Sequence, residues 1–398
     1  MERSDLIKLA LATGCAEERN GAVFLRDPHA SESARAQFDA ISREAGEGLG
    51  NGDGWLCLPT GGTSGGLRFA RHDEETLSAA VVGFCAHFGV ARVNALDVLP
   101  AYHVSGFMSR VRCFATAGEH SAWLWKQLEA GEWPDLEHKE DGWFLSLVPT
   151  QLQRLLASDR SIEKLREFRT VFLGGGPMWP ELAEAAAAAN VPVSICYGMT
   201  ETAAMVVVQR AGEFLSGDRS CGQAMPHARI EIVDENTGVA LPPRATGLVR
   251  ISGASVCRGY WPAAKLDRSF LTEDLGRLDS DGALTLLGRR DAVIITGGKK
   301  VHPLDVEAAL RSSAALGDFA VVGIPDPEWG SVVVVCYAAS GDRFDKAAVE
   351  KALQGLESYK WPKRFVAVSP WPRNAQGKIN RAALVAAATG APARTSRL

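Results

Sequence analysis

The sequence lacks any paired cysteine motif. Its eight cysteines are scattered along 398 residues, and no two form a C-x-x-C pair. That spacing argues against a zinc site and against a disulfide framework. It favours a reducing compartment, so we expect a cytoplasmic protein without structural disulfides.

Long apolar runs and blocks of basic charge are also missing. No apolar stretch reaches the length needed to span a bilayer. The first residues, "MERSDLIKLALATGCAEERN", carry acidic residues on both sides of a short apolar patch, so no secretory signal is expected. The formal net charge is −4 with no basic cluster, which makes nucleic acid a poor candidate partner.

What remains is an ordinary globular composition, with 46% hydrophobic and 23% charged residues. The length favours two or more folding units. The stretch "RTVFLGGG", then "PELAEAAAAAN", then "VPVSICYG" has the order strand, glycine turn, helix, strand, which is typical of a parallel α/β sheet. Residues 1–50 are weakly patterned, and we expect them to be mostly helical.

Near residue 229 the pattern changes. "ARIEIVD", "GLVRISG" and "ALTLLG" predict short strands in a small β unit. After Arg289, strands alternate with helices in a compact tail. We therefore predict an α/β protein with parallel or mixed sheets: a large N-terminal domain (1–288) that includes the β unit, and a small mobile α+β C-terminal domain (289–398).

The segment "LPTGGTSGG" begins at Leu58 and has almost no side chain to bury. Glycines let a backbone approach a ligand closely, and successive N–H groups can form an anion-binding nest. Hydroxyl groups and a following arginine add hydrogen-bond donors, so a polyphosphate is one candidate ligand. The stretch has no Gly-Lys-Ser/Thr and is not a Walker A loop. A plain surface loop is the alternative.

Three further motifs bear on that choice: "YGMTETAAM" from Tyr197, "LGRRDAVIITGGKKVHPLDVE" from Leu287, and "PRNAQGKINR" from Pro372. With the glycine-rich segment they resemble, in order and spacing, the adenylate-forming superfamily of acyl- and aryl-CoA synthetases, luciferases and adenylation domains. The resemblance covers roughly residues 55–385. It implies an enzyme that uses ATP and Mg²⁺ to activate a carboxylic acid and then passes it to coenzyme A.

The resemblance also implies roles for individual residues. Thr200 and Glu201 would contact phosphate and Mg²⁺, and Asp274 and Arg289 would hold the ribose. The phosphates and the adenine would be held by the glycine-rich loop, the turn after residue 173 and the start of the "YGMTE" motif: Thr60, Gly62, Thr63, Ser64, Gly65, Arg68, Gly174, Gly175, Gly176, Pro177, Tyr197 and Gly198. In isolation, Thr200–Glu201 also fits a helix N-cap.

The small domain would act as a lid. Asp291 matches the family's hinge position, on which this domain turns between two half-reactions. Gly297 and Gly298 resemble the segment that lines the pantetheine channel. Lys378 resembles the lysine that bridges the attacking carboxylate and the α-phosphate.

For the acid, "LPAYHVSGFMSRVRCF" and "FLSLVPTQLQRLL" resemble the o-succinylbenzoate–CoA ligases of menaquinone and phylloquinone biosynthesis. That substrate has two carboxylates. The resemblance assigns Arg112 to the second one, with Ser105 and Ser146 as polar pocket positions. Arg110 competes for the role, because two residues apart on a strand the arginines would share a face. The alternative is that both are exposed. His103 either faces the activated carboxylate or packs in the core.

The glycine-rich loop lies closer to the start of the chain than is usual in the superfamily. We therefore expect an abbreviated N-terminal subdomain, either sufficient alone or covered by the partner of a homodimer. The alternatives to an o-succinylbenzoate ligase are another aryl- or acyl-CoA ligase, a stand-alone enzyme that loads a carrier protein, and a nucleotide-binding protein without turnover.

Overall fold

The computed structural model describes residues 1–44, 53–61, 67–262, 264–311, 316–339, 345–373 and 379–390. These form two compact units. The large unit comprises Met1–Met178, Leu182–Thr272 and Arg277–Thr285; the small unit comprises Trp179–Glu181, Glu273–Gly276 and Leu286–Leu398. The domain boundary and hinge near residues 288–291 stay predictions.

The first sheet of the large unit has the order β1-β2-β3-β4-β14-β15. Its strands are β1 (Ala16–Arg19), β2 (Ala22–Leu25), β3 (Leu56–Gly61), β4 (Leu67–His72), β14 (Gly259–Tyr260) and β15 (Ala264–Lys265). The helices of this stretch are α1 (Arg3–Leu11) and α2 (Glu32–Arg43). Helix is the main element of this stretch, as expected, but β1 and β2 were not predicted: β2 is a short apolar run whose four residues are all buried, too short to be told from helix by periodicity.

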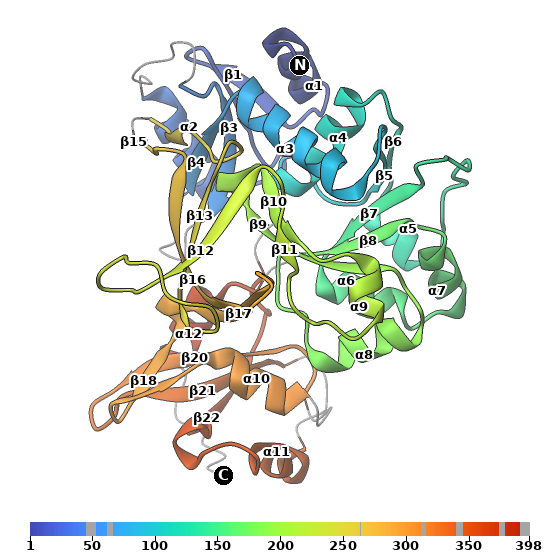
Figure 1. Cartoon of the computed structure of the whole chain (residues 1–398). Helices are drawn as coiled ribbons and strands as arrows, with labels where there is room; N and C mark the ends of the chain where they lie inside the picture. Colours follow the sequence, from blue (N-terminus) through green and yellow to red (C-terminus); the bar gives the residue numbers. More distant parts are fainter. Residues whose placement is uncertain are drawn as a thin grey trace. The chain divides into compact units, whose positions relative to one another are not determined.

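The second sheet has the order β11-β10-β9-β8-β7-β5-β6 (Figure 1). Its strands are β5 (Asn94–Asp97), β6 (His120–Ala122), β7 (Trp143–Leu147), β8 (Thr170–Leu173), β9 (Val193–Met199), β10 (Ala204–Val208) and β11 (Gln223–Ala224). β5 to β9 pair in parallel, as the sequence predicts. A helix precedes or follows most of these strands: α3 (Glu74–Phe88), α4 (Val104–Ala115), α5 (Trp125–Glu129), α6 (Pro149–Leu155), α7 (Asp159–Arg166), α8 (Pro180–Ala188) and α9 (Ala211–Leu215).

An aromatic cluster joins α3 to this sheet. Phe84 and Phe88 of α3 contact Phe144 of β7 and Phe172 of β8 at ring-centroid distances of 5.2 to 5.7 Å. Burying aromatic side chains is among the largest single contributions to a core. The cluster fixes α3, and with it the neighbouring helix α4, against the centre of the sheet.

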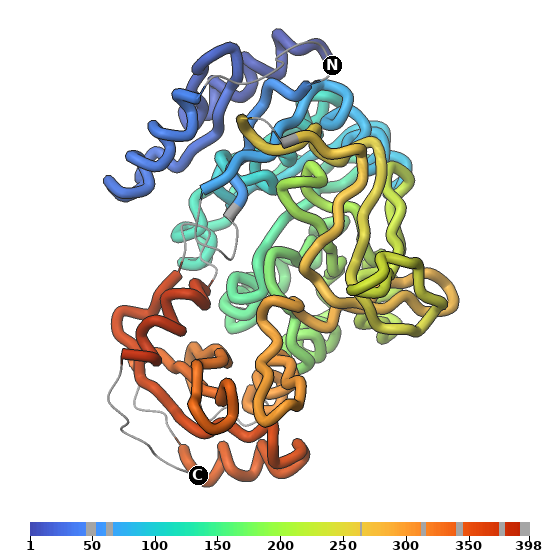
Figure 2. Tube along the Cα trace, turned by 90° about the vertical axis from the view of Figure 1, so that its left-hand side faces the viewer, coloured from blue at the N-terminus to red at the C-terminus, as the bar shows by residue number. Residues whose placement is uncertain are grey.

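The predicted small β unit is a four-stranded sheet of order β12-β13-β16-β17. Its strands are β12 (Ala228–Val233), β13 (Gly247–Gly253), β16 (Ser269–Leu278) and β17 (Leu284–Arg289). β12 and β13 run antiparallel and side by side, coloured yellow in Figure 2.

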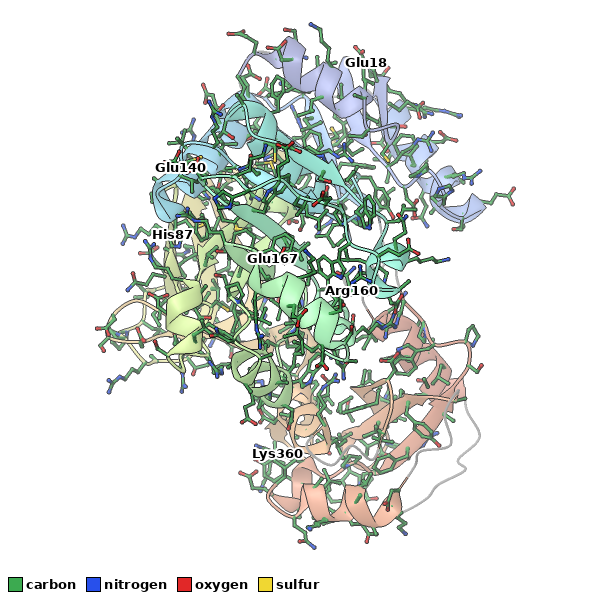
Figure 3. All side chains as sticks on the ribbon, turned by 90° about the vertical axis from the view of Figure 1, so that its right-hand side faces the viewer. Glu18, His87, Glu140, Arg160, Glu167 and Lys360 are labelled. Atoms are coloured by element: carbon green, nitrogen blue, oxygen red, sulfur yellow. The ribbon has the colours of Figure 1, made fainter. Side chains whose placement is uncertain are left out.

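The small unit carries the sheet β19-β18-β21-β20, with β22 paired to β21. Its elements are β18 (Ile294–Thr296), β19 (Lys299–Val301), α10 (Pro303–Arg311), β20 (Phe319–Asp326), β21 (Gly330–Ala338), α11 (Lys346–Leu353), β22 (Arg364–Val368) and α12 (Arg381–Gly390). Lys360, labelled in Figure 3, lies within 3.2 Å of Asp305 and Glu357. In the described residues, no helix is both long and apolar enough to cross a membrane.

Candidate active site

Glu201 is the centre of the candidate site. It lies in the 3₁₀ turn Thr200–Thr202 between β9 and β10 and is only 5% exposed. One carboxylate oxygen, Oε1, accepts hydrogen bonds from Thr60 Oγ1 at 3.1 Å and from Tyr260 Oη at 3.0 Å. No described residue donates to Oε2. The two hydroxyls therefore hold the carboxylate by one oxygen and leave the other available to a ligand.

Arg68 adds positive charge beside this carboxylate. It lies opposite Thr60 in the β3–β4 ladder, and its guanidinium sits 4.7 Å from the centre of the Tyr260 ring. β3 and β4 therefore form the hairpin expected to carry the phosphate loop. Gly62, Thr63, Ser64 and Gly65 lie outside the described residues, so their predicted role stays a prediction.

His72 supports the same turn from β4. Its side chain is inaccessible to solvent, and Nε2 lies 2.8 Å from the backbone carbonyl oxygen of Thr200. Because a carbonyl oxygen only accepts, Nε2 carries the proton and donates. Nδ1 lies 3.1 Å from Thr76 Oγ1. Burial lowers the pKa of His72 to about 4, so the ring is neutral near pH 7.

The residues predicted to bind adenine lie in the turn that follows β8 and in β9. Gly175 has φ +76°, a left-handed conformation that favours glycine. Gly198 has a structural requirement of its own: a Cβ there would lie 2.0 Å from the carbonyl oxygen of Ala204. Gly198 is therefore needed where β10 approaches β9. Tyr197 is buried in β9. Contact of Gly174, Gly176, Pro177 and these residues with a nucleotide stays a prediction.

Arg112 is a buried guanidinium in the core between α3 and α4. The residue is 4% exposed, its side chain lies over the Phe84 ring at 4.6 Å, and its Nε has no hydrogen-bond partner among the described residues. Burial lowers its pKa to about 10, which leaves it charged near pH 7. A buried guanidinium whose Nε finds no acceptor among the described residues is unfavourable, so this cation is suited to an anionic group.

The structure corrects two expectations about this segment. Arg110 and Arg112 lie on the helix α4, not on a strand, and two residues on a helix diverge by about 200°. The alternative that both are exposed is wrong for Arg112. Arg110 is half-buried, and its Nε also has no partner.

The other predicted acid-pocket residues surround α4. Ser105 is exposed and lies about two turns before Arg112, on the same side of the helix. His103 is the N-cap residue of α4, and its ring lies 4.3 Å from that of Tyr102. Ser146 is half-buried in β7, an inner strand of the second sheet. Their contact with a substrate stays a prediction.

In the small unit, Arg289 lies between two carboxylates. Its Nε and Nη2 donate to Asp291 at 2.9 and 2.8 Å, and its Nη1 donates to Asp274 at 3.4 Å. The predicted ribose pair is thus adjacent, and the hinge candidate Asp291 is in contact with it. Gly297 and Gly298 form the β18–β19 turn with φ +54° and +77°. Lys378 lies outside the described residues.

The donor set fits one kind of metal better than others. The described residues contain no group of three or more His, Cys, Asp or Glu side chains that would hold an ion. Magnesium is bound by one or two carboxylates together with substrate phosphates and water. Glu201, with Oε2 free of protein donors, fits that pattern.

Two residues of this site were missed from the sequence. Tyr260 and His72 reach the Thr200–Glu201 turn from β14 and β4, far away in the chain. The only sequence signal was the position of His72 four residues after Arg68, at the end of a strand.

Comparison with known proteins adds a family. Residues 15–261 match the family model described as AMP-binding enzyme, and residues 305–378 match the AMP-binding enzyme C-terminal domain. The first match covers more than half of the chain.

Individual relatives are similar over most of the chain. A 2-succinylbenzoate–CoA ligase of Enterococcus faecalis is 30% identical over 330 residues, which are 80% of this chain and 67% of that protein. An indoleacetate–CoA ligase of Aromatoleum aromaticum is 30% identical over 336 residues, 82% of this chain and 66% of the relative. This chain thus spans about two thirds of their length.

Among solved structures, o-succinylbenzoate CoA synthetase from Bacillus subtilis, in complex with the acyl-adenylate intermediate OSB-AMP, matches with a TM-score of 0.73 and 26% identity. The match covers 86% of this chain and 70% of that one. The mixed α/β fold with a large N-terminal and a small C-terminal domain is confirmed.

Proposed function

Because the chain belongs to the family of AMP-binding enzymes, we propose that it is an ATP-dependent acid–CoA ligase that makes o-succinylbenzoyl-CoA through an acyl-adenylate. The reaction would serve menaquinone or phylloquinone biosynthesis. The named relatives and the solved structure with OSB-AMP support this substrate. The single observation that carries the proposal is Arg112, a buried cation with an unpartnered Nε on α4.

The first half-reaction joins the acid to the α-phosphate of ATP and releases pyrophosphate. The protein's task is to position the reactants and stabilise developing negative charge. Arg68 would hold phosphate oxygens, Thr60 would line the phosphate site beside it, and the Thr200 hydroxyl would exchange its bond to the Pro59 carbonyl oxygen for one to phosphate. Glu201, through Oε2, would hold Mg²⁺, which neutralises phosphate charge when bound. Asp274 and Arg289 would hold the ribose hydroxyls.

The acid would bind with its second carboxylate at Arg112. A guanidinium can donate two parallel hydrogen bonds to a carboxylate, and such charged bonds are stronger in a dry site than in water. Replacing the unfavourable lone charge by an ion pair favours a dicarboxylic acid over a monocarboxylic one. Ser105, on the same side of α4, would line the pocket between the two carboxylates.

In the second half-reaction the thiol of coenzyme A attacks the acyl-adenylate and AMP leaves. The small unit would turn at Asp291 between the two half-reactions. Lys378 would stabilise the adenylation transition state, and Gly297 and Gly298 would line the path of the thiol. Positive φ at both glycines supports a tight turn, and at Gly298 a Cβ would meet nothing within 4 Å, which leaves room for a ligand there.

A second candidate is an aryl-CoA ligase for an acid with one carboxylate, favoured by the indoleacetate–CoA ligase relative. A carrier-loading enzyme is a third. For location we propose the cytoplasm, because all eight cysteines are free and five of them are buried. A homodimer stays a prediction of the sequence, and light scattering at micromolar concentration would test it.

The experiment is a pyrophosphate-release screen with ATP, Mg²⁺ and a panel of acids. We expect o-succinylbenzoate to give a much higher kcat/KM than benzoate or indoleacetate. Equal rates with monocarboxylic acids would favour the second candidate. If a thioester product forms only with a carrier protein and not with free coenzyme A, the third candidate is favoured.

A further inference from the structure

A solvent-open hollow of about 510 Å³ lies beside the small β unit. Three arginines line it: Arg219 after α9, Arg244 before β13, and Arg277 in β16. All lie in the large unit, and none belongs to the nucleotide or acid site described above. A cavity of this size is suited to a small molecule.

Arg219 is already held in place. Its Nη1 donates to the carbonyl oxygens of Phe214 and Asp218 at 2.6 and 2.9 Å, and its guanidinium lies 4.6 Å from the Phe214 ring centre. Only one of its three nitrogens makes these bonds. A guanidinium that is fixed in this way loses little side-chain entropy when a ligand binds.

The two carboxylates that line this hollow accept hydrogen bonds from residues of their own turns. Asp218 accepts from the backbone N and the hydroxyl of Ser220, both at 2.8 Å. Asp279 Oδ1 accepts from the backbone N of Asp281 at 2.9 Å and of Ala283 at 2.8 Å. In the described part of the chain, neither carboxylate forms an ion pair with Arg219, Arg244 or Arg277. The lining therefore carries three cationic and two anionic side chains, one positive charge in excess.

Arg244 holds an unusual backbone. Its φ is +69°, in the left-handed region that favours glycine, and its backbone N donates to the carbonyl oxygen of Leu278 at 2.7 Å. A non-glycine residue in that conformation is a pointer to function when its side chain lines a cavity. Glycine would satisfy the turn equally well, but only arginine supplies the charge.

We propose that this cavity is a binding site for a phosphate monoester. Guanidinium forks match the geometry and charge of a phosphate dianion, and three exposed ones line this hollow. A second hollow of about 720 Å³ adjoins the first and shares Asp218 and Asp279 with it. Its lining includes carboxylates that can accept hydrogen bonds from the hydroxyls of a sugar phosphate, with the phosphate held among the arginines of the first hollow: Glu213, Asp218, Asp279 and Asp281.

The test is calorimetric titration of the full chain with glucose 6-phosphate and with inorganic phosphate. A non-hydrolysable ATP analogue with Mg²⁺ fills the nucleotide site first, so the readout does not depend on turnover. We expect one binding event that weakens as salt increases. Arg277→Gln and Arg244→Gln should each weaken it about tenfold, the loss expected for a hydrogen bond to a charged group.

Arg229→Gln is the matched control: this exposed arginine of β12 pairs with Glu231 and lies outside the cavity, so binding should not change. Arg244→Gly separates binding from folding, because glycine adopts the left-handed conformation without strain. This variant should keep or raise the melting temperature and still lose phosphate binding. An absence of binding to the parent protein would overturn the proposal. So would equal binding by Arg277→Gln and Arg229→Gln.

Discussion

The hydroxyl of Tyr260 donates to Oε1 of Glu201 across 59 positions of sequence. Burial and the nearby Glu201 carboxylate both raise the pKa of Tyr260, so its hydroxyl stays protonated and can only donate to that oxygen. Thr60 donates to the same oxygen. The pair orients the carboxylate through Oε1 and leaves Oε2 without a donor among the described residues.

Tyr260→Phe should therefore raise the Mg²⁺·ATP requirement while changing the fold little. Groups that orient a metal ligand typically contribute about 10- to 100-fold in affinity or activity. Titration of Mn²⁺ into the protein–ATP complex, followed by electron paramagnetic resonance, measures the affinity for the divalent ion without turnover. Tyr337→Phe, the same change in β21 of the small unit, is the control. Equal Mn²⁺ affinity in both variants would remove Tyr260 from the site.

Arg112→Ala should weaken the use of o-succinylbenzoate by roughly 10- to 100-fold, because a charged hydrogen bond in a buried site is lost. The requirement for ATP should change little. Arg110→Ala is the comparison. A raised KM in Arg110→Ala alone would give the role to Arg110, and no change in either variant would contradict the dicarboxylate assignment.

The lowered pKa of His72 predicts that the stability of the protein depends on pH. Its folded-state pKa is lowered from 6.5 to about 4. Below pH 6.5 the unfolded chain binds a proton that the folded chain does not, so stability falls as the pH decreases toward 4 and this contribution changes no further below it. The shift corresponds to roughly 3 kcal/mol. Urea unfolding of His72→Gln should therefore show a shallower loss between pH 6.5 and 4 than the parent; parallel curves would contradict the neutral assignment.

Gly198→Ala should strongly destabilise the protein, because its Cβ would lie 2.0 Å from a β10 carbonyl oxygen. Gly212→Ala is the matched control: in α9 its Cβ would meet nothing within 4 Å, and alanine favours helix by about 1 kcal/mol. Melting temperatures check both. A mild effect of Gly198→Ala would show that β9 and β10 separate easily.

The sequence predicted much of this fold because its signals are local. The apolar runs in β8 and β21 are continuous, and the "YGMTE" motif places Glu201 directly after a strand. The hydroxyl pair on Glu201 was not predictable: Thr60 lies 141 positions away, and only the pairing of distant segments brings it there. Arg112 was misplaced on a strand because residues 104–115 mix small, apolar and basic residues without a clear period.

The most direct test of the account is to follow the two half-reactions separately by mass spectrometry. With ATP, Mg²⁺ and o-succinylbenzoate but no coenzyme A, the protein should form o-succinylbenzoyl-AMP, and Lys378→Ala should lose this step by orders of magnitude. Supplied with the adenylate and coenzyme A, both proteins should make the thioester at similar rates. If the parent protein forms no acyl-adenylate, or if Lys378→Ala impairs both steps equally, the proposed two-step mechanism is contradicted.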